Sequence, residues 1–231
     1  ILSKHTKNKE TFNNILAIIP VRGENYGERE VALKKINKIP IIQKLIIELQ
    51  KTPHIKKILV SSPDQEILKN VNKKFRNKVI IHKREAKFAR LNTSINETLI
   101  SSIKKVKTKK FRPDLILVVN VVCPFLNHQN FESAINLIKI FNTDEVIAVK
   151  KENDNFYYHN GKGLKSFQNN NNLSLEREEV FREIGGMHLI KTQRIGKKNN
   201  TIGHIFLNDK SSFKIKSNKD ILLADILSKL N

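Results

Sequence analysis

The residues best suited to chemistry lie in one polar loop, residues 22–35, directly after a short apolar run. Arg22 and Arg29 supply guanidinium groups that suit phosphate, and Gly23 and Gly27 permit a close approach of the backbone to a ligand. The spacing matches neither G-x-G-x-x-G nor a P-loop, which ends in Gly-Lys-Ser or Gly-Lys-Thr. These residues alone therefore leave two interpretations open, a phosphate-binding loop and an ordinary polar connection.

Other reactive side chains are few. A single cysteine, Cys123, excludes an intramolecular disulfide and a multi-cysteine zinc site. It follows an apolar run with no histidine and acid pattern around it, so we expect a packed small side chain rather than a nucleophile. The seven histidines show no metal-ligand spacing. His188 follows Gly185 and Gly186, and either lines a pocket or packs as an ordinary histidine.

The chain is strongly basic, because 43 lysines and arginines against 22 acidic residues give a net charge of +21. Nucleic-acid binding is one explanation, and a solvated surface rich in lysine and asparagine is the other. The densest basic segments, 104–110 and 196–200, fall where a helix end and a loop are expected. With no tryptophan and three tyrosines, few rings are available to stack on bases. We expect a solvated surface and no nucleic-acid partner, although a basic pocket would also suit a nucleotide.

The composition indicates a globular protein, with 39% hydrophobic and 28% charged residues over 231 positions. No apolar run approaches the ~20 residues that span a bilayer. The first ten residues have no apolar signal-peptide core. We therefore expect a cytoplasmic protein without a membrane partner.

Apolar periodicity predicts strands that alternate with amphipathic helices. Short apolar runs predict strands at 15–20, 56–62, 78–83, 114–121 and 145–151. Helical spacing of apolar residues predicts helices at 39–52, 63–75, 92–106 and 128–141. This alternation indicates an α/β fold with a mostly parallel sheet, in which the most apolar strand, 114–121, is central. Ligands bind beyond the carboxyl ends of strands in such sheets, which is where loop 22–35 would lie.

The pattern changes after residue 151. We predict a hairpin with an Asn160–Gly161 turn, an apolar segment at 181–190, and a strand followed by a helix within 213–230. Residues 1–231 are interpreted as a single domain, with residues 152–180 as an inserted arm for oligomerisation.

Seven segments occur in an order that carries information beyond any one of them: IIPVRGENYGEREVA, KIPIIQKLI, VSSPDQEI, REAKFA, VVNVVCPFL, FREIGGMHLI and SFKIKSNKDILLAD. Together they resemble the acylneuraminate cytidylyltransferases (CMP-sialic acid synthetases) across nearly the whole chain, with the CMP-KDO synthetases as more distant relatives. The resemblance implies a three-layer, Rossmann-like domain of the nucleotide-diphospho-sugar transferase type. It also implies a homodimer joined by the protruding arm.

The resemblance further implies a reaction and a set of site residues. CTP is joined to the anomeric hydroxyl of a sialic-acid-like sugar acid, and pyrophosphate is released. Arg22 and Lys34 are the residues matched to catalysis. The nucleotide-binding positions are Arg22, Gly23, Glu24, Gly27, Arg29, Arg84 and Asn120. The sugar-binding positions are Asn120, Arg182, Gly186 and His188.

Departures from the family pattern leave the activity open. The Lys-Asn pair of the family loop aligns with Val31 and Ala32, so Lys34 or Lys35 would have to supply the missing ammonium group through a shift in register. The two aspartates that hold Mg²⁺ in the family align with Lys214 and Lys216, which cannot ligate a metal. We therefore assign no metal-binding residue.

Two acids near these lysines, Asp209 and Asp220, could replace the missing carboxylates, but a turn acid and a first-turn helix acid are the simpler interpretations. The sequence thus supports two hypotheses. The first is a divergent cytidylyltransferase. The second is a non-catalytic pseudoenzyme that binds a nucleotide, a sugar nucleotide or a partner subunit.

Overall fold

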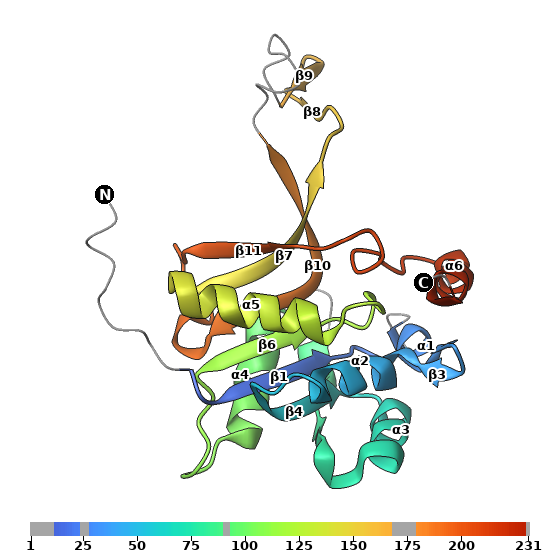
Figure 1. Cartoon of the computed structure of the whole chain (residues 1–231), viewed down its shortest axis with the longest axis vertical. Coiled ribbons are helices and arrows are strands. Elements are labelled where there is room, and N and C mark those ends of the chain that lie inside the picture. The colour runs from blue at the N-terminus through green and yellow to red at the C-terminus, as the bar shows by residue number, and fades with distance from the viewer. Residues whose placement is uncertain (1–11, 24–27, 90–92, 168–178, 230–231) are drawn as a thin grey trace.

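The chain folds around one twisted sheet with helices on both faces (Figure 1). The computed structural model describes residues 12–23, 28–89, 93–167 and 179–229. The strands are β1 (Ile15–Pro20), β2 (Lys35–Ile36), β3 (Ile39–Pro40), β4 (Ile55–Ser62), β5 (Ile80–Lys83), β6 (Leu115–Val119), β7 (Glu145–Glu152), β8 (Tyr157–His159), β9 (Leu164–Ser166), β10 (Val180–Lys191) and β11 (Ile202–Phe206). The helices are α1 (Glu28–Leu33), α2 (Ile41–Gln50), α3 (Gln65–Phe75), α4 (Ile95–Val106), α5 (His128–Phe141) and α6 (Asn218–Lys229), with short 3-10 helices at Arg76–Lys78, Ala86–Ala89 and Thr192–Arg194.

The main sheet has the strand order β11-β7-β10-β6-β1-β4-β5. Strand β10 runs antiparallel to both of its neighbours, and all other pairs in this sheet are parallel. Strand β6 lies at the centre, as its apolar sequence predicts. The expected α/β fold with a mostly parallel sheet is therefore confirmed.

Strand β1 shows why these sequences form buried strands. All of its residues but the last are fully buried. Ile15, Ala17 and Ile19 belong to the larger core, which also contains the apolar faces of α2, α3 and α5. Leu16 and Ile18 belong to the smaller core under α4. Because side chains alternate between the faces of a strand, a strand buried on both faces must be continuously apolar.

The helices begin where the sequence supplies a cap. The Asp64 side chain accepts hydrogen bonds from backbone N–H groups in the first turn of α3, and Ser94 does the same for α4. Asn127 and Asn130 form a reciprocal capping box at the start of α5. The four helices predicted between residues 39 and 141 are all present, with ends that differ from the prediction by at most three residues.

Three local predictions require correction. Residues 213–216 form no strand, although α6 follows as expected. The predicted Asn160–Gly161 turn is instead a four-residue loop, Asn160 to Gly163, closed by a 3.1 Å hydrogen bond from the Asn160 N–H to the Gly163 carbonyl. The edge strand β11 was not predicted, because the apolar pattern of IGHIF is short.

An arm rises from the sheet where β7 and β10 continue past their neighbours, and the small β8–β9 sheet lies near its tip (Figure 1). Its large apolar side chains are exposed: Tyr157, Tyr158, Leu164 and Phe167. Among the described residues, no helix is both long and apolar enough to cross a membrane.

Candidate functional site

The candidate site lies at the carboxyl ends of β1, β4, β5 and β6, the edge where open α/β sheets bind ligands. Arg22 and Gly23 follow β1, and Arg84 follows β5. Asn120 follows β6 and is tied to β10, since its N–H donates to the Gly186 carbonyl at 2.8 Å. Residues that are far apart in the sequence thus meet at one edge of the sheet.

Gly23 has a positive φ of +100°, and Asp64 lies directly against it. A Cβ atom at Gly23 would be 3.1 Å from the Asp64 Cβ and 3.3 Å from its Oδ2. Asp64 is buried, with 7% exposure, and its Oδ1 accepts from the Glu66 N–H at 2.9 Å. The requirement for glycine here therefore has a structural cause, which is the left-handed backbone next to a buried carboxylate.

Arg84 is buried beneath the loop that follows β1 and forms a hydrogen bond to the end of that strand. Its side chain is 4% exposed, and its Nη1 and Nη2 donate to the Thr98 Oγ1 at 2.8 Å and the Val21 carbonyl at 3.0 Å. The guanidinium group thus joins the end of β1 to α4. These contacts make Arg84 a positioning residue for Arg22 and Gly23.

The turn after β6 is closely packed against Gly186 of β10. The Asn120 Oδ1 accepts from the Val122 N–H at 3.2 Å, and Cys123 is fully buried. A Cβ atom at Gly186 would be 2.7 Å from the Cys123 Sγ, so only glycine fits there. Burial raises the pKa of the Cys123 thiol to about 11, against a smaller opposing effect of Lys214. A buried, protonated thiol agrees with the expected packing role.

Lys214 lies over this turn. Its Nζ is 3.8 Å from the position that a Cβ at Gly185 would take, and Gly185 has a φ of +67°. The next residue, Ile215, is buried and donates its N–H to the Val122 carbonyl at 2.8 Å. Segment 213–216 is therefore fixed against the site, with an ammonium group where the family resemblance implies a metal.

The residues present do not fit Mg²⁺. Over the ranges that the structure describes, no three or more His, Cys, Asp or Glu side chains come together in a group that could hold a metal ion. Asp209 pairs instead with Lys150, at 2.8 Å between Oδ1 and Nζ. The Asp220 Oδ2 accepts from the N–H groups of Lys216 and Ser217 and from the Ser217 hydroxyl. Those hydrogen bonds lower the pKa of Asp220, which serves as a first-turn acid of α6.

More positive charge flanks the loop after β6. The Lys44 and Lys210 Nζ atoms lie 5.7 and 5.9 Å from the centre of the Phe125 ring. Burial and the charge of Lys210 lower the pKa of Lys44, while Glu48 has a smaller opposing effect. A cavity of about 330 Å³ opens beside Phe125, between α2 and residues 124–127. This side of the site therefore favours an anionic ligand.

Three other predicted site residues, Arg182, His188 and Lys34, have contacts with residues outside this edge. The Arg182 Nε is 2.5 Å from the Glu152 Oε1, at the base of the arm. The His188 Nε2 is 3.0 Å from the Glu145 Oε2, at the amino end of β7. Lys34 has an exposed side chain, and its carbonyl accepts from the Ile41 N–H at the start of α2.

Some predicted site residues cannot be placed. Glu24 and Gly27 lie outside the described residues, and only the backbone of Arg29, in α1, is described. The Lys216 side chain is exposed.

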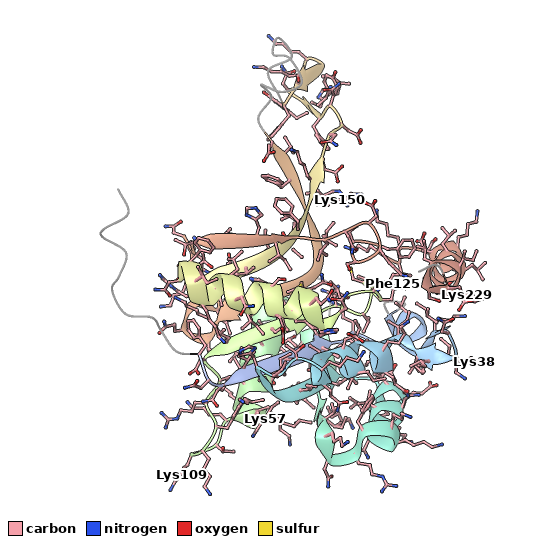
Figure 2. The ribbon with its side chains drawn as sticks, viewed as in Figure 1. Lys38, Lys57, Lys109, Phe125, Lys150 and Lys229 are labelled. Carbon is pink, nitrogen blue, oxygen red and sulfur yellow. The ribbon has the colours of Figure 1, made fainter. Side chains whose placement is uncertain are left out.

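Sequence reasoning did not single out Asp64 as a site residue, because it fell inside the helix predicted at 63–75. The available signal was its position two residues past the end of a predicted strand, 56–62. Other lysines are spread around the body of the molecule rather than gathered at the site. Figure 2 labels five of them: Lys38, Lys57, Lys109, Lys150 and Lys229.

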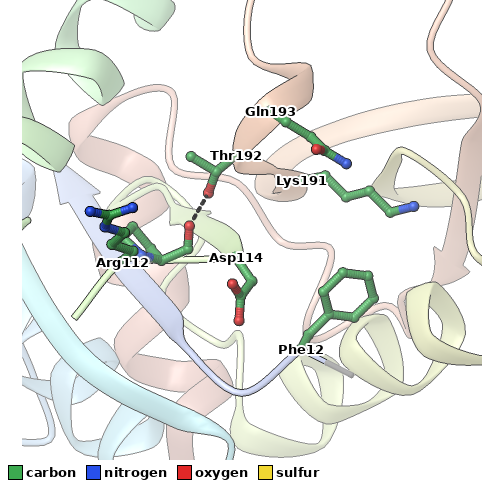
Figure 3. Close-up of a pocket in the computed structure, with 7 residues that line it drawn as sticks. Phe12, Arg112, Asp114, Lys191, Thr192 and Gln193 are labelled. Carbon is green, nitrogen blue, oxygen red and sulfur yellow. Dashed lines mark hydrogen bonds between the residues drawn. The ribbon is translucent and has the colours of Figure 1, made fainter. Parts of the chain in front are cut away.

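A second cavity, of about 680 Å³, lies at the opposite edge of the sheet and is lined by Phe12, Arg112, Pro113, Asp114, Lys191, Thr192 and Gln193 (Figure 3). Its polar groups form hydrogen bonds within the protein. The Asp114 Oδ2 accepts from the N–H groups of Asn13 and Asn14, and Thr192 donates to the Pro113 carbonyl at 2.8 Å. The Lys191 Nζ is 2.5 Å from the Asn142 Oδ1. We place the ligand site at the carboxyl edge for these reasons.

Solved structures share this fold over nearly the whole chain. One is 4-diphosphocytidyl-2C-methyl-D-erythritol synthase from Anaerococcus prevotii, with a TM-score of 0.71, 13% identity, and coverage of 94% of this chain and 96% of that one. Another is a CMP:2-keto-3-deoxy-manno-octonic acid synthetase complexed with CTP, with a TM-score of 0.69, 11% identity, and coverage of 93% and 98%. No protein-family model and no curated protein sequence matches the chain. At these identities the likeness establishes the fold.

Proposed function

We propose that this protein binds CTP and a sialic-acid-like sugar acid at the carboxyl edge of its sheet, as a divergent cytidylyltransferase. The observation that carries the proposal is the placement of four residues at that edge, with Arg22 after β1, Asn120 bonded to Gly186, and Lys214 beside the preceding glycine. Each of these positions matches a site position in the acylneuraminate cytidylyltransferase pattern. Both neighbouring structures are named for cytidylyl chemistry, and one was solved with CTP.

The proposed reaction is a displacement at the α-phosphorus of CTP. The anomeric hydroxyl oxygen of the sugar acid forms a bond to that phosphorus, and the bond to the oxygen that bridges the α- and β-phosphates breaks. Pyrophosphate leaves with that oxygen, and the hydroxyl proton passes to solvent. Cationic side chains, among them Arg22 in the loop after β1, would stabilise the negative charge that develops on the phosphates.

A second candidate is a non-catalytic binder of nucleotide or sugar nucleotide. The observation that favours it is the pairing of Asp209 with Lys150 and the capping role of Asp220, so that neither of these acids replaces the aspartates of the family pattern. This candidate keeps the same ligand site and lacks turnover.

Calorimetry with CTP, followed by an assay of pyrophosphate release with a panel of nonulosonic acids, separates these candidates. CTP binding with turnover supports the cytidylyltransferase, and CTP binding without turnover for any acid in the panel supports the binder. If CTP does not bind, with or without Mg²⁺, the cytidylyltransferase is wrong. If no other nucleotide or sugar nucleotide binds either, the binder is wrong as well. Salt-sensitive binding of any DNA or RNA, with no preference for mononucleotides, would instead favour a nucleic-acid surface.

The protein is further proposed to act as one domain that forms a homodimer through the arm at 152–180. Isolated two-stranded hairpins are at best marginally stable, and this one exposes Tyr158 at 46% and Leu164 at 74%. A partner arm would bury these side chains. Sedimentation equilibrium should give a dimer for the unmodified protein and a monomer for a Tyr158→Ser/Leu164→Ser variant. A monomeric unmodified protein would contradict this proposal.

A further inference from the structure

The position that the family pattern gives to a metal ligand carries an ammonium group here, and the structure holds that group in place. Residues on both sides of Lys214 are anchored. Phe213 packs edge-on against Phe125, with 6.0 Å between ring centres, and Ile215 is 3% exposed and bonded to the Val122 carbonyl. The lysine itself remains exposed. Its backbone is therefore ordered while its charge stays available to a ligand.

The surface under this ammonium group is bare backbone. Gly185 presents no side chain, and among the described residues beyond its two chain neighbours only the Lys214 Nζ comes within 4 Å of its Cβ position. Gly186 adds no side chain either, and its carbonyl is already bonded to the Asn120 N–H. An anionic group that enters over these glycines therefore meets the Lys214 ammonium directly.

Two described acids near Lys214 in the sequence, Asp209 and Asp220, are engaged elsewhere. Asp209 is paired with Lys150, and Asp220 accepts hydrogen bonds from the turn that precedes α6. The Lys214 charge also lowers the pKa of the Cys123 thiol slightly, against the larger effect of burial, so its field reaches the loop after β6. Magnesium would meet repulsion at this point, whereas a phosphate would meet attraction.

We propose that Lys214 takes the charge-neutralising place of the metal at this site, so that the protein binds a nucleoside triphosphate without a divalent cation. The inference rests on the proposed nucleotide site, and it adds that the Lys214 ammonium group is the cation that neutralises the phosphates there. A lysine ammonium donates charge-assisted hydrogen bonds to phosphate oxygens and needs no carboxylate ligands.

The test is CTP binding by calorimetry in EDTA and in millimolar Mg²⁺. It compares the unmodified protein with Lys214→Met, which keeps the chain length and removes the charge. Lys219→Met is the matched control, because Lys219 is exposed on the first turn of α6 and its loss changes the net charge equally. Unfolding midpoints of both variants check that the fold is kept.

We expect the unmodified protein to bind CTP in EDTA, with an affinity that Mg²⁺ changes less than about twofold. Lys214→Met should weaken binding roughly 10- to 100-fold, the range for losing one or two charge-assisted hydrogen bonds, and Lys219→Met less than about twofold. Binding that requires Mg²⁺ would overturn the inference and leave the proposed function standing. Equal effects of the two variants would also overturn it. No CTP binding under either condition would overturn both.

Discussion

Substituting Gly186 by alanine should destabilise the protein through a steric conflict at the candidate site. An added Cβ would lie 2.7 Å from the Cys123 Sγ, 2.9 Å from the Cys123 Cβ and 3.3 Å from the Leu126 Cδ1. Cys123 is 0% exposed and Leu126 is 1% exposed, so neither side chain can turn toward solvent. The new methyl group therefore has to displace the turn after β6 or the strand that carries it.

Overpacking a closed core costs about 1–3 kcal/mol. Because two of the three distances lie below 3.0 Å, we expect about 2 kcal/mol, which for a domain of this size lowers the melting temperature by about 4–8 °C. Removing the obstruction should recover part of this loss. In a Cys123→Gly background, where both close atoms are gone, Gly186→Ala should cost at least about 1 kcal/mol less.

The assay is equilibrium unfolding in urea, followed by far-UV circular dichroism because the chain has no tryptophan. The four proteins of the cycle are the unmodified chain, the two single variants and the double variant. The steric explanation is refuted if Gly186→Ala changes the free energy of unfolding by less than about 0.5 kcal/mol, or if its cost is the same in both backgrounds.

Three further predictions concern buried polar groups. Arg84→Met removes hydrogen bonds to Val21 and Thr98 and should lower the free energy of unfolding by about 2–4 kcal/mol in the same urea assay; an unchanged midpoint would contradict the positioning role. Burial and two nearby cations lower the pKa of His82 below 6.5, so the unfolded chain binds the proton more readily and the free energy of unfolding should fall as pH drops below about 6.5. His82→Gln should flatten that fall in melting curves from about pH 7.5 to 5, and an unaltered pH profile would refute this cause. The buried Cys123 thiol, with its pKa of about 11, should react with iodoacetamide at pH 7.5 far more slowly in the native protein than in urea. Mass spectrometry measures both rates, and equal rates would show that the thiol is accessible.

Local chemistry let the sequence predict most of the elements. Strand β1 is continuously apolar because it is buried on both faces, and α2 repeats apolar residues at helical spacing because one of its faces is buried. Gly23 was expected where the backbone needs close approach, and Cys123 was expected to be packed. These features depend on a residue's own type and its near neighbours, so they can be read without the fold.

Other features depended on partners far away in the sequence. Strand β11 forms because β7 offers it an edge, although its own pattern is short. Residues 213–216 pair with no strand and instead pack on the loop after β6, so the strand predicted there is absent. The side chain of Asp64 meets Gly23 because β4 lies beside β1.

The sequence by itself determined the α/β class, the order of the main strands and helices up to residue 151, and the lysines at the two positions that the family resemblance aligns with metal ligands. Only the tertiary structure decided that Asp209 turns to Lys150, that Arg182 turns to Glu152, and that Lys214 lies over Gly185. The physical reason is that periodicity encodes which face of an element is buried, whereas a charged side chain chooses its partner among groups that only folding brings within reach.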